Sequence, residues 1–575
     1  MAVEVVMPIL GLTVEKGKIT KWLRSEGDEV KKGEPIFEVE ADKVTTEVES
    51  PASGILNSII VPEGVEVPVL TVLAVITEKG EELPEKYKIL KKSAVGEPPS
   101  PTPVYHLEGY GKDFDIAIIG AGPGGYIAAI RGAQLGAKVL LVEKSELGGT
   151  CLNSGCIPTK CFLSDIKNYQ KVKNSEVFLK GSEILINVKK MVSRKNQVIE
   201  TMKKGISSLL ESQGVTVIKG VGSLADPKRI QVSSNGKTEN YKAQHVVIAS
   251  GSQPSSLPSI KFDGKLILSS DDVLEMKEIP DSILIIGGGV NGVEFATIFN
   301  GLGSKVTILE MLPQIIPTED EEIVKGLRLI LEKKGTKILT KTKVLWASQK
   351  KGKVEVKVQI DGREEVVLGQ QVLVAVGRSP NTEGLGLETI GIQRDDKFIK
   401  VNSRMETNVD GVYAVGDVIG KMMLAHAASA EGIIAVENIM GRARGIDYQR
   451  IPSCIYTSPE VASVGLKESE AIQKGYHVRV GKFPYLKSGK ALAIGEPEGF
   501  VKIIAEEQLG EILGVHILGE AATDLIGEYL LGMHTEVCVE DLAEVVKGHP
   551  TLSEIGTEAA LDWQKRAIHT PKRTN

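Results

Sequence analysis

The chain has 575 residues, 42% of them hydrophobic and 25% charged, with a formal net charge of −6. This length is too great for one hydrophobic core and predicts about four domains. The acidic balance offers no surface for nucleic acid, no apolar run approaches the ~18 residues that cross a bilayer, and the segment after Met1 lacks a signal pattern, so we expect a cytoplasmic protein without nucleic-acid or membrane partners.

Residues 1–77 alternate short β-branched runs with glycine-containing turns, a pattern typical of short strands. Within them Glu26-Gly-Asp-Glu-Val30 returns as Glu63-Gly-Val-Glu-Val67. We therefore expect a small all-β domain of two similar halves, each burying the apolar face of the other. Residues 78–112 are rich in charged residues and prolines, which predicts an extended, flexible linker.

A second repeat, at an offset of 167 residues, predicts two dinucleotide-binding units. Each copy has a strand, a glycine-rich turn, a helix and a second strand that ends on an acidic residue. Such glycines permit a tight turn and let backbone amides at a helix N-terminus approach a pyrophosphate, while the acidic residue accepts hydrogen bonds from ribose hydroxyls. The residues are Gly120, Gly122, Gly125 and Glu143 in the first copy, and Gly287, Gly289, Gly292 and Glu310 in the second. A carboxylate at Glu310 would repel a 2′-phosphate, which favours NAD over NADP.

The segment Cys151-Leu-Asn-Ser-Gly-Cys156-Ile-Pro-Thr-Lys160 follows the first copy. A thiol pair beside a bound dinucleotide suggests electron transfer between a disulfide and a flavin, whereas the alternative is three thiols, Cys161 included, on a buried helix. In a regular helix, residues five apart have Cα atoms roughly 8–9 Å apart, beyond the ~7 Å that a disulfide allows. We therefore expect a distorted helix, which Gly155 and Pro158 permit.

From about residue 113 to its end the chain resembles the dihydrolipoamide dehydrogenases, of the glutathione-reductase superfamily. The resemblance rests on the Cys151–Lys160 segment, both glycine repeats, Ala249-Ser-Gly251, Val376-Gly-Arg378, Gly416-Asp417, Leu424-Ala-His426 and Gly548-His-Pro-Thr-Leu-Ser-Glu554. It implies an α/β fold with two Rossmann-like domains and an α+β dimerisation domain. The expected divisions are an FAD-binding domain (113–258), an NAD-binding domain (259–383), a central domain that completes the FAD site (384–450) and an interface domain (451–575).

The resemblance also implies that the first repeat binds FAD tightly but non-covalently and that the second binds NAD. The residues expected at FAD are Gly120, Gly122, Gly125, Glu143, Lys144, Gly149, Thr150, Lys160, Gly222, Ser250, Gly251, Asp417 and Ala425. Those expected at NAD are Gly287, Gly289, Gly292, Glu310, Val344 and Gly377. Ser250 stands where such proteins often have threonine, so a hydroxyl is kept. No metal site is expected.

The resemblance assigns four residues near the flavin. Cys156, the thiol nearer the ring, would form the thiolate charge-transfer partner, and Cys151 would exchange with the dithiol substrate. A helix N-terminus lowers the pKa of such a thiolate. Lys160 would stabilise reduced flavin, with Glu294 as its ion-pair partner.

The base expected from the resemblance is His549, oriented by Glu554. An imidazole titrates near neutral pH, which suits removal of a thiol proton. In such enzymes this histidine faces the flavin of the other subunit, so we expect a homodimer. The implied order is deprotonation of a dithiol by His549, exchange with the Cys151–Cys156 disulfide, transfer of electrons to FAD, and release as hydride to NAD+.

Residues 1–77 are similar to lipoyl domains, with Lys43 at a hairpin tip as the expected site of covalent lipoyl attachment. Biotinyl domains share the fold but flank their lysine with methionines, where this chain has Asp42 and Val44. A carrier tethered to the enzyme that reoxidises it raises the local substrate concentration. We therefore expect a component of a 2-oxoacid or acetoin dehydrogenase complex, acting on the dihydrolipoyl domains of its acyltransferase subunits.

Three alternatives remain at this point. A glutathione-type reductase would generally use NADPH and have arginines near the ribose, where Glu310 stands here. A mercuric reductase would carry paired C-terminal cysteines, which this sequence lacks. A lipoyl carrier or scaffold with an inactive flavin domain conflicts with the complete set of Cys151, Cys156, Lys160, His549 and Glu554.

Overall fold

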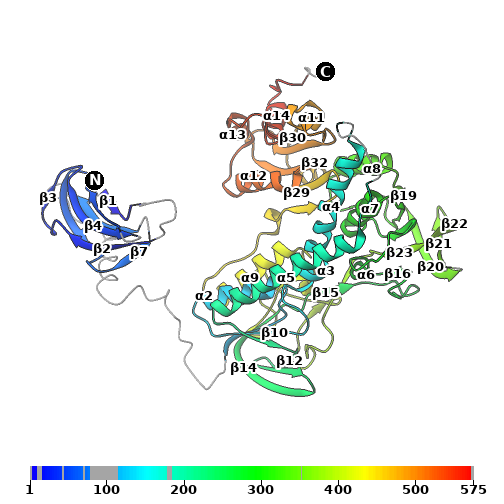
Figure 1. Cartoon of the computed structure of the whole chain (residues 1–575), viewed down its shortest axis with the longest axis horizontal. Coiled ribbons are helices and arrows are strands. Elements are labelled where there is room, and N and C mark those ends of the chain that lie inside the picture. The colour runs from blue at the N-terminus through cyan, green and yellow to red at the C-terminus, as the bar shows by residue number, and fades with distance from the viewer. Residues whose placement is uncertain are drawn as a thin grey trace. The chain divides into compact units, whose positions relative to one another are not determined.

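A computed structural model describes residues 3–8, 16–41, 44–68, 71–77, 114–175, 177, 184–350 and 352–570. The chain divides into two compact units, Met1–Tyr105 and His106–Asn575 (Figure 1). The predicted linker at 78–112 lies outside the described residues. Within the ranges described, no helix combines the length and apolar character needed to cross a bilayer.

The N-terminal unit consists of two four-stranded antiparallel sheets, which confirms the predicted all-β domain. The first sheet has the order β1 (Val3–Val6), β8 (Val72–Thr77), β6 (Gly54–Ile59) and β3 (Glu29–Val30). The second has the order β5 (Val44–Glu49), β4 (Pro35–Ala41), β2 (Lys16–Trp22) and β7 (Glu66–Pro68). One hydrophobic core joins them, because buried side chains from both sheets belong to it, among them Ile19, Phe37, Leu56 and Leu73.

The two halves of this unit exchange equivalent hydrogen bonds. Glu26 accepts a bond from the backbone N–H of Ile59 at 2.6 Å, and Glu63 accepts one from the N–H of Trp22 at 2.6 Å. Both glutamates and both amide groups are separated by the same 37 residues along the chain. Each half therefore supplies a carboxylate to a strand of the other, and the repeat seen in the sequence is a structural repeat.

The hairpin expected to carry lipoyl is formed by β4 and β5. These strands pair antiparallel, and their last pair is Ala41 opposite Val44. Lys43 itself lies outside the described residues.

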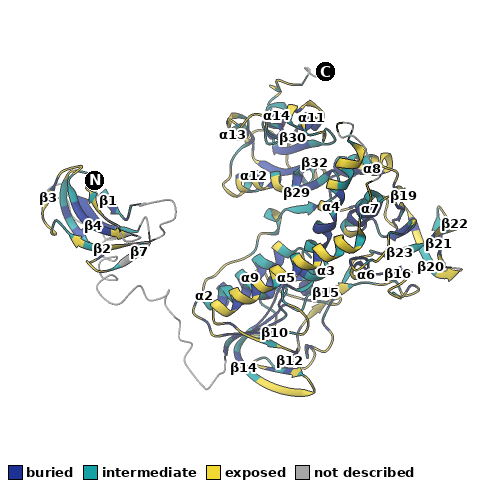
Figure 2. Cartoon of the chain, viewed as in Figure 1, coloured by how far each residue is buried: buried dark blue, intermediate teal, exposed yellow. Residues whose placement is uncertain are grey.

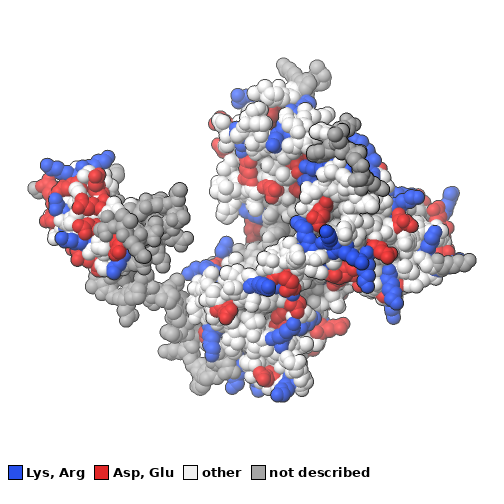
Figure 3. Space-filling model, viewed as in Figure 1, with Lys and Arg blue, Asp and Glu red and all other residues white. Residues whose placement is uncertain are grey.

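Charge is distributed unevenly along the chain. Residues 1–77 contain thirteen acidic and seven basic side chains, so this segment carries the whole net charge of −6 and the remainder is neutral. Figure 3 shows the acidic side chains spread over the visible face of the N-terminal unit. An acidic domain repels like-charged surfaces and is attracted to basic ones, with a range limited by salt.

Two five-stranded parallel sheets form the dinucleotide-binding part, as predicted. Four strands have the same order in both, whereas the edge strand beside the fourth comes last in the chain in the first sheet and first in the second. The first runs β11 (Thr216–Lys219), β10 (Val139–Glu143), β9 (Phe114–Ile119), β14 (Lys237–Ile248) and β27 (Val412–Ala414). The second runs β19 (Lys337–Leu339), β18 (Lys305–Leu309), β17 (Ser282–Ile286), β23 (Gln371–Val374) and β16 (Ile267–Leu268).

Each parallel sheet has an antiparallel three-stranded companion. In the first, β12 (Val221–Asp226) and β13 (Arg229–Ser234) pair with the long strand β14. In the second, β20 (Thr342–Lys350), β21 (Lys353–Ile360) and β22 (Arg363–Gly369) form a separate sheet. The two glycine turns therefore belong to two similar units rather than standing alone, although the 167-residue offset does not extend to the later strands.

Helices cover the parallel sheets. They are α2 (Pro123–Gln134), α3 (Gly149–Ser154), α4 (Cys156–Asn174), α5 (Val188–Ser212), α6 (Ser270–Val273), α7 (Val290–Gly301), α8 (Glu321–Lys333) and α9 (Ala425–Ile439). Helix α9 packs against α2, and a Cβ added at Gly432 would lie 2.3 Å from the carbonyl oxygen of Gly124. Together with β27, this contact places part of the predicted central domain on the first sheet.

The C-terminal part contains a five-stranded antiparallel sheet with helices packed on it. The sheet order is β28 (Ser453–Ile455), β29 (Glu460–Gly465), β32 (Ile512–Gly519), β31 (Phe500–Glu506) and β30 (Val478–Pro484). Its helices are α10 (Glu468–Gln473), α11 (Gly489–Ala493), α12 (Ala522–His534), α13 (Val539–Glu544) and α14 (Glu554–Trp563). Figure 2 shows the central strands buried and the outer helix faces exposed, as expected for an α+β domain.

Candidate functional site

A cavity of about 1720 Å³ lies where the two dinucleotide-binding units meet the C-terminal part. This volume exceeds the ~300–1,000 Å³ of a pocket for one drug-sized ligand, so it has room for more than one extended ligand. Most residues expected at the site line it: Gly120, Gly122, Glu143, Lys144, Gly149, Thr150, Cys151, Cys156, Lys160, Gly222, Ser250, Gly251, Gly287, Gly289, Glu294, Glu310, Val344, Gly377, Asp417 and Ala425.

The two glycine turns have nearly the same backbone geometry. Gly120 has φ +106° and Gly287 has φ +108°, and a Cβ at either would lie 2.3 Å from a backbone carbonyl oxygen. Helices α2 and α7 begin after Gly122 and Gly289, neither of which provides a side-chain cap. The first N–H groups of both helices are therefore available to a pyrophosphate, so the residues present fit FAD and NAD.

The acidic residue of each copy supports its own glycine turn. Glu143 accepts a hydrogen bond from the backbone N–H of Ala121 at 2.7 Å, and Glu310 accepts one from the N–H of Gly288. The second oxygen of each carboxylate accepts from the amide two residues further along the chain. Because both carboxylates also line the cavity, they are fixed where a ribose would lie.

The third glycine of each copy does not line the cavity. A Cβ at Gly125 would lie 1.8 Å from the carbonyl oxygen of Gly120, and one at Gly292 would lie 2.0 Å from that of Gly287. These two residues, expected among the cofactor contacts, instead allow the helix to pack closely on its turn.

The predicted distortion between the two thiols is present. Helix α3 ends at Ser154 and α4 begins at Cys156, so Gly155 separates them. A Cβ at Gly155 would lie 3.0 Å from the carbonyl oxygen of Thr150 and 3.4 Å from the Cα of Cys151, which glycine avoids. Pro158 lies in the first turn of α4, where its missing N–H has no helical partner to lose.

Cys151 and Cys156 are free thiols and are hydrogen-bonded to each other. The bond from Cys151 lowers the pKa of Cys156 to about 7, and the charge of Lys160 acts in the same direction. The shared bond and burial raise the pKa of Cys151. Cys156 also occupies the N-terminus of α4, which favours a thiolate. Of the two thiols, Cys156 therefore has the lower pKa.

Lys160 is held in the cavity wall by two contacts. Its Nζ atom lies 3.0 Å from both carboxylate oxygens of Glu294, and it lies 4.2 Å from the centre of the Tyr456 ring. The backbone N–H of Tyr456 donates to Glu294 at 2.9 Å. Sequence reasoning missed Tyr456, which follows β28 and reaches Lys160 only through the tertiary fold.

His549 and Glu554 form a pair, with Nδ1 2.9 Å from Oε1. The backbone N–H of Thr551 donates to the other carboxylate oxygen, and this bond, followed by the histidine, lowers the pKa of Glu554. The imidazole is 80% exposed and does not line the cavity, so within one chain it is not brought to the thiols.

Comparison with known proteins agrees with this geometry. A family model described as pyridine nucleotide-disulphide oxidoreductase matches residues 114–432, and the dimerisation-domain model of the same family matches residues 451–560. A third model, described as biotin-requiring enzyme, matches residues 3–76. The three models cover both units of the chain.

Individual relatives narrow the family further than the family models do. A dihydrolipoyl dehydrogenase of Bacillus subtilis is 41% identical over 470 residues, which is 80% of this chain and 99% of that protein. One of Thermus scotoductus is 43% identical over 466 residues, 80% of this chain and 100% of that protein. The solved structure of LpdA from Mycobacterium tuberculosis, with 28% identity and a TM-score of 0.73, covers 78% of this chain and 99% of that one. The chain therefore belongs to the pyridine nucleotide-disulphide oxidoreductases, among the dihydrolipoyl dehydrogenases.

Proposed function

We propose that this chain oxidises protein-bound dihydrolipoyl groups to lipoyl with NAD+, using Cys151 and Cys156 as its dithiol–disulfide couple. The observation that carries the proposal is the thiol pair itself, set at a broken helix in the cavity that both glycine turns line. In the exchange, one disulfide forms in the substrate as one opens in the enzyme. The two electrons and a proton then leave as hydride, and a second proton is released.

The chain's own residues divide this chemistry. His549 of the partner subunit takes the proton of the substrate thiol, and Glu554 orients the ring and stabilises its cation. Cys151 exchanges with the substrate, and Cys156 holds the negative charge beside Lys160. FAD, when bound, supplies the two-electron acceptor between the dithiol and NAD+.

The residues proposed for each cofactor follow from the two turns. FAD and NAD are the cofactors of this family. The first turn with Glu143, and Asp417 across the cavity, would hold FAD, whereas the second turn with Glu310 would hold NAD. Glu310 already accepts two backbone hydrogen bonds as a carboxylate, which favours NAD because a 2′-phosphate would meet its charge.

A homodimer completes the site in this proposal. The match to a dimerisation domain, the exposed His549 and the absence of this residue from the cavity lining of its own chain all support it. We further propose the division into FAD-binding (113–258), NAD-binding (259–383), central (384–450) and interface (451–575) domains.

The N-terminal unit is proposed to carry lipoyl on Lys43. The match over residues 3–76 and the β4–β5 hairpin support a carrier domain, and the acidic balance of residues 1–77 gives it a distinct surface. We propose that the enzyme serves a 2-oxoacid or acetoin dehydrogenase complex through the dihydrolipoyl domains of its acyltransferase subunits. Its cytoplasmic location stays a prediction from the sequence.

Removing the charge of Lys160 tests the thiolate at Cys156. The lowered pKa means that the thiolate forms as pH rises through about 7. The long-wavelength absorbance of a thiolate against oxidised flavin should follow the same midpoint in the two-electron-reduced enzyme. In Lys160→Met this midpoint should move to higher pH, because a cation no longer stabilises the anion.

The matched control is Lys167→Met, which removes another lysine of α4 that pairs with Glu520 outside the cavity. This variant should keep the parent midpoint. If the pH midpoint of the absorbance in Lys160→Met is unchanged or lower, the assignment of the thiolate to Cys156 is contradicted.

Mixed dimers test whether His549 serves the partner. His549→Gln homodimers should lose about 10²–10⁴-fold in turnover, the usual contribution of a general base, and keep their flavin. A dimer of one Cys151→Ser chain and one His549→Gln chain, purified with two different tags, should recover about half of the parent activity. It has one intact site only if the histidine acts across the interface. Activity no higher than that of either mutant homodimer rules this arrangement out.

Lys43→Arg separates the carrier from the catalyst. The variant should show no lipoyl mass increment after expression beside a lipoyl ligase, because amide linkage needs the lysine amine. It should keep its rate on free dihydrolipoamide. Lys32→Arg, on the same unit, should be lipoylated normally. Loss of the rate on free substrate in Lys43→Arg would contradict the division of labour.

A further inference from the structure

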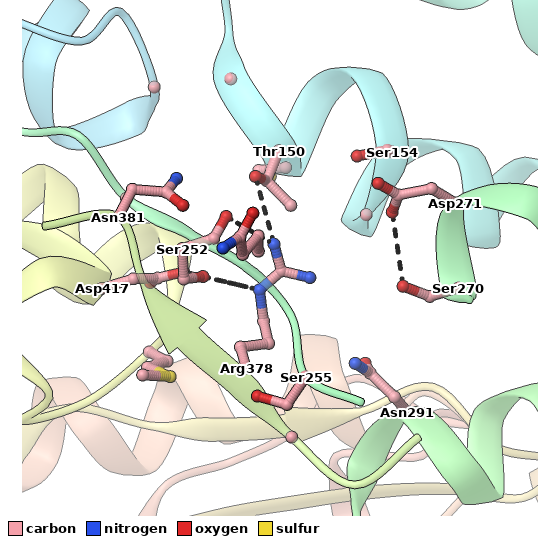
Figure 4. Close-up of a pocket in the computed structure, with 18 of the residues that line it drawn as sticks. Thr150, Ser154, Ser252, Ser255, Ser270, Asp271, Asn291, Arg378, Asn381 and Asp417 are labelled. Carbon is pink, nitrogen blue, oxygen red and sulfur yellow. Dashed lines mark hydrogen bonds and ion pairs between the residues drawn. The ribbon is translucent and has the colours of Figure 1, made fainter. Parts of the chain in front are cut away.

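Arg378 connects the two dinucleotide-binding units inside the cavity. It begins β24 (Arg378–Pro380), which follows the second parallel sheet and pairs antiparallel with β15 (Ser252–Pro254), which follows the first. Its side chain is 15% exposed and lines the cavity. Figure 4 shows the guanidinium group among Thr150, Ser252 and Asp417.

The guanidinium group contacts two segments of the FAD-binding unit. Nε donates to the hydroxyl of Ser252 at 2.6 Å, and Nη2 donates to the carbonyl oxygen of Ser252 at 2.9 Å. Nη2 also lies 3.4 Å from the hydroxyl of Thr150, the residue before Cys151. One arginine therefore contacts both β15 and the helix that carries the exchanging thiol.

The Ser252 hydroxyl extends this contact to Asp417. It accepts from Arg378 and donates its own proton to the carboxylate of Asp417. Arg378 Nε lies 3.9 Å from the same carboxylate oxygen. Because Ser252 is only 5% exposed, its hydroxyl is held in this bridging position rather than free to turn toward water.

The other end of α3 lies beside a second side chain from the NAD-binding unit. Ser154, the last residue of α3, faces the carboxyl group of Asp271, the second residue of α6, and acts to lower its pKa. Burial raises the pKa of Asp271, and the charge of Arg378 opposes that rise. Arg378 of β24 thus contacts Thr150 near the start of the short helix on which Cys151 lies, and Asp271 of α6 lies beside Ser154 at its end (Figure 4).

We propose that Arg378 is a positioning residue that couples the FAD-binding carboxylate of Asp417 to the helix carrying Cys151. It orients Asp417 through Ser252 and restrains α3 through Thr150. One guanidinium group therefore fixes the positions of both the carboxylate expected at FAD and the exchanging thiol. The coupling needs the fork of an arginine, since a lysine has one nitrogen and cannot make both contacts in this geometry. The proposal rests on the proposed function for the roles of Asp417 and Cys151.

A purely structural arginine makes a different prediction. The β15–β24 pairing is formed by backbone groups and would persist without the side chain. If Arg378 only supported this pairing, its loss would lower thermal stability. FAD affinity and thiol reactivity, measured on the folded protein, would stay at the parent values. The coupling proposal instead requires FAD affinity and Cys151 reactivity to change together in fully folded protein.

The test uses the full-length chain with Arg378→Gln, Arg378→Lys and the control Ser379→Ala. Ser379 is the next residue of β24 and contacts Ser255 and Lys397, not Asp417 or Thr150. Two quantities are measured on folded protein: the dissociation constant of FAD from the reconstituted apoprotein, and the rate at which iodoacetamide alkylates Cys151 in the reduced holoenzyme, followed by peptide mass.

Arg378→Gln should weaken FAD binding by about tenfold or more, the usual effect of losing a charge-assisted hydrogen-bonding group. It should also alkylate Cys151 about threefold faster or more, because α3 loses one restraint. Arg378→Lys should recover part of the FAD affinity, since a cation remains near Asp417, and little of the restraint on Cys151. Ser379→Ala should match the parent in both.

Two results overturn the coupling. One is Arg378→Gln with parent values for both quantities. The other is a change in only one of them, which would leave Arg378 as a residue of either the flavin site or the thiol helix alone. Failure of the parent enzyme to oxidise dihydrolipoamide would instead count against the proposed function, because neither measurement depends on turnover.

Discussion

The interruption of one helix at Gly155 is the constraint on which the site depends. Two thiols five residues apart on a regular helix would be too far apart to bond. Ending α3 at Ser154 and restarting at Cys156 lets Cys151 and Cys156 hydrogen-bond and places Cys156 at the N-terminus of a long helix. Lys160, one turn further along α4, is held by Glu294 and adds its charge to the same thiol.

Repetition supplies the frame around this pair. Two parallel sheets that share the order of four strands bring two glycine turns to one cavity, and each turn is held by the carboxylate that ends its second strand. The small N-terminal unit is also built from a repeat, since Glu26 and Glu63 make equivalent hydrogen bonds between its halves. The similarity to dihydrolipoyl dehydrogenases, with a match to a carrier domain in the same chain, favours the dehydrogenase over the glutathione-type and inactive-scaffold alternatives.

Local and repeated features were predictable from the sequence, and contacts between distant segments were not. The glycine turns, the all-β N-terminal unit and the break near Gly155 follow from spacing and residue type. Tyr456 contacts Lys160, and Arg378 approaches Asp417, only in the folded chain. No short-range sequence pattern therefore predicts these two contacts. For Gly125 and Gly292 the motif identified the positions but not their role. Both allow a helix to pack closely on its turn, and neither lines the cavity.

The most direct test of the account is differential alkylation of the five cysteines before and after anaerobic reduction with one equivalent of dihydrolipoamide. The oxidised enzyme should yield a peptide with Cys151 joined to Cys156 under denaturing conditions, while Cys161, Cys454 and Cys538 alkylate as free thiols. After reduction, label should appear at Cys151 and Cys156 alone among the newly accessible positions. Alkylation of Cys151 and Cys156 before reduction, or a bond between either of them and another cysteine, would contradict the proposed electron route.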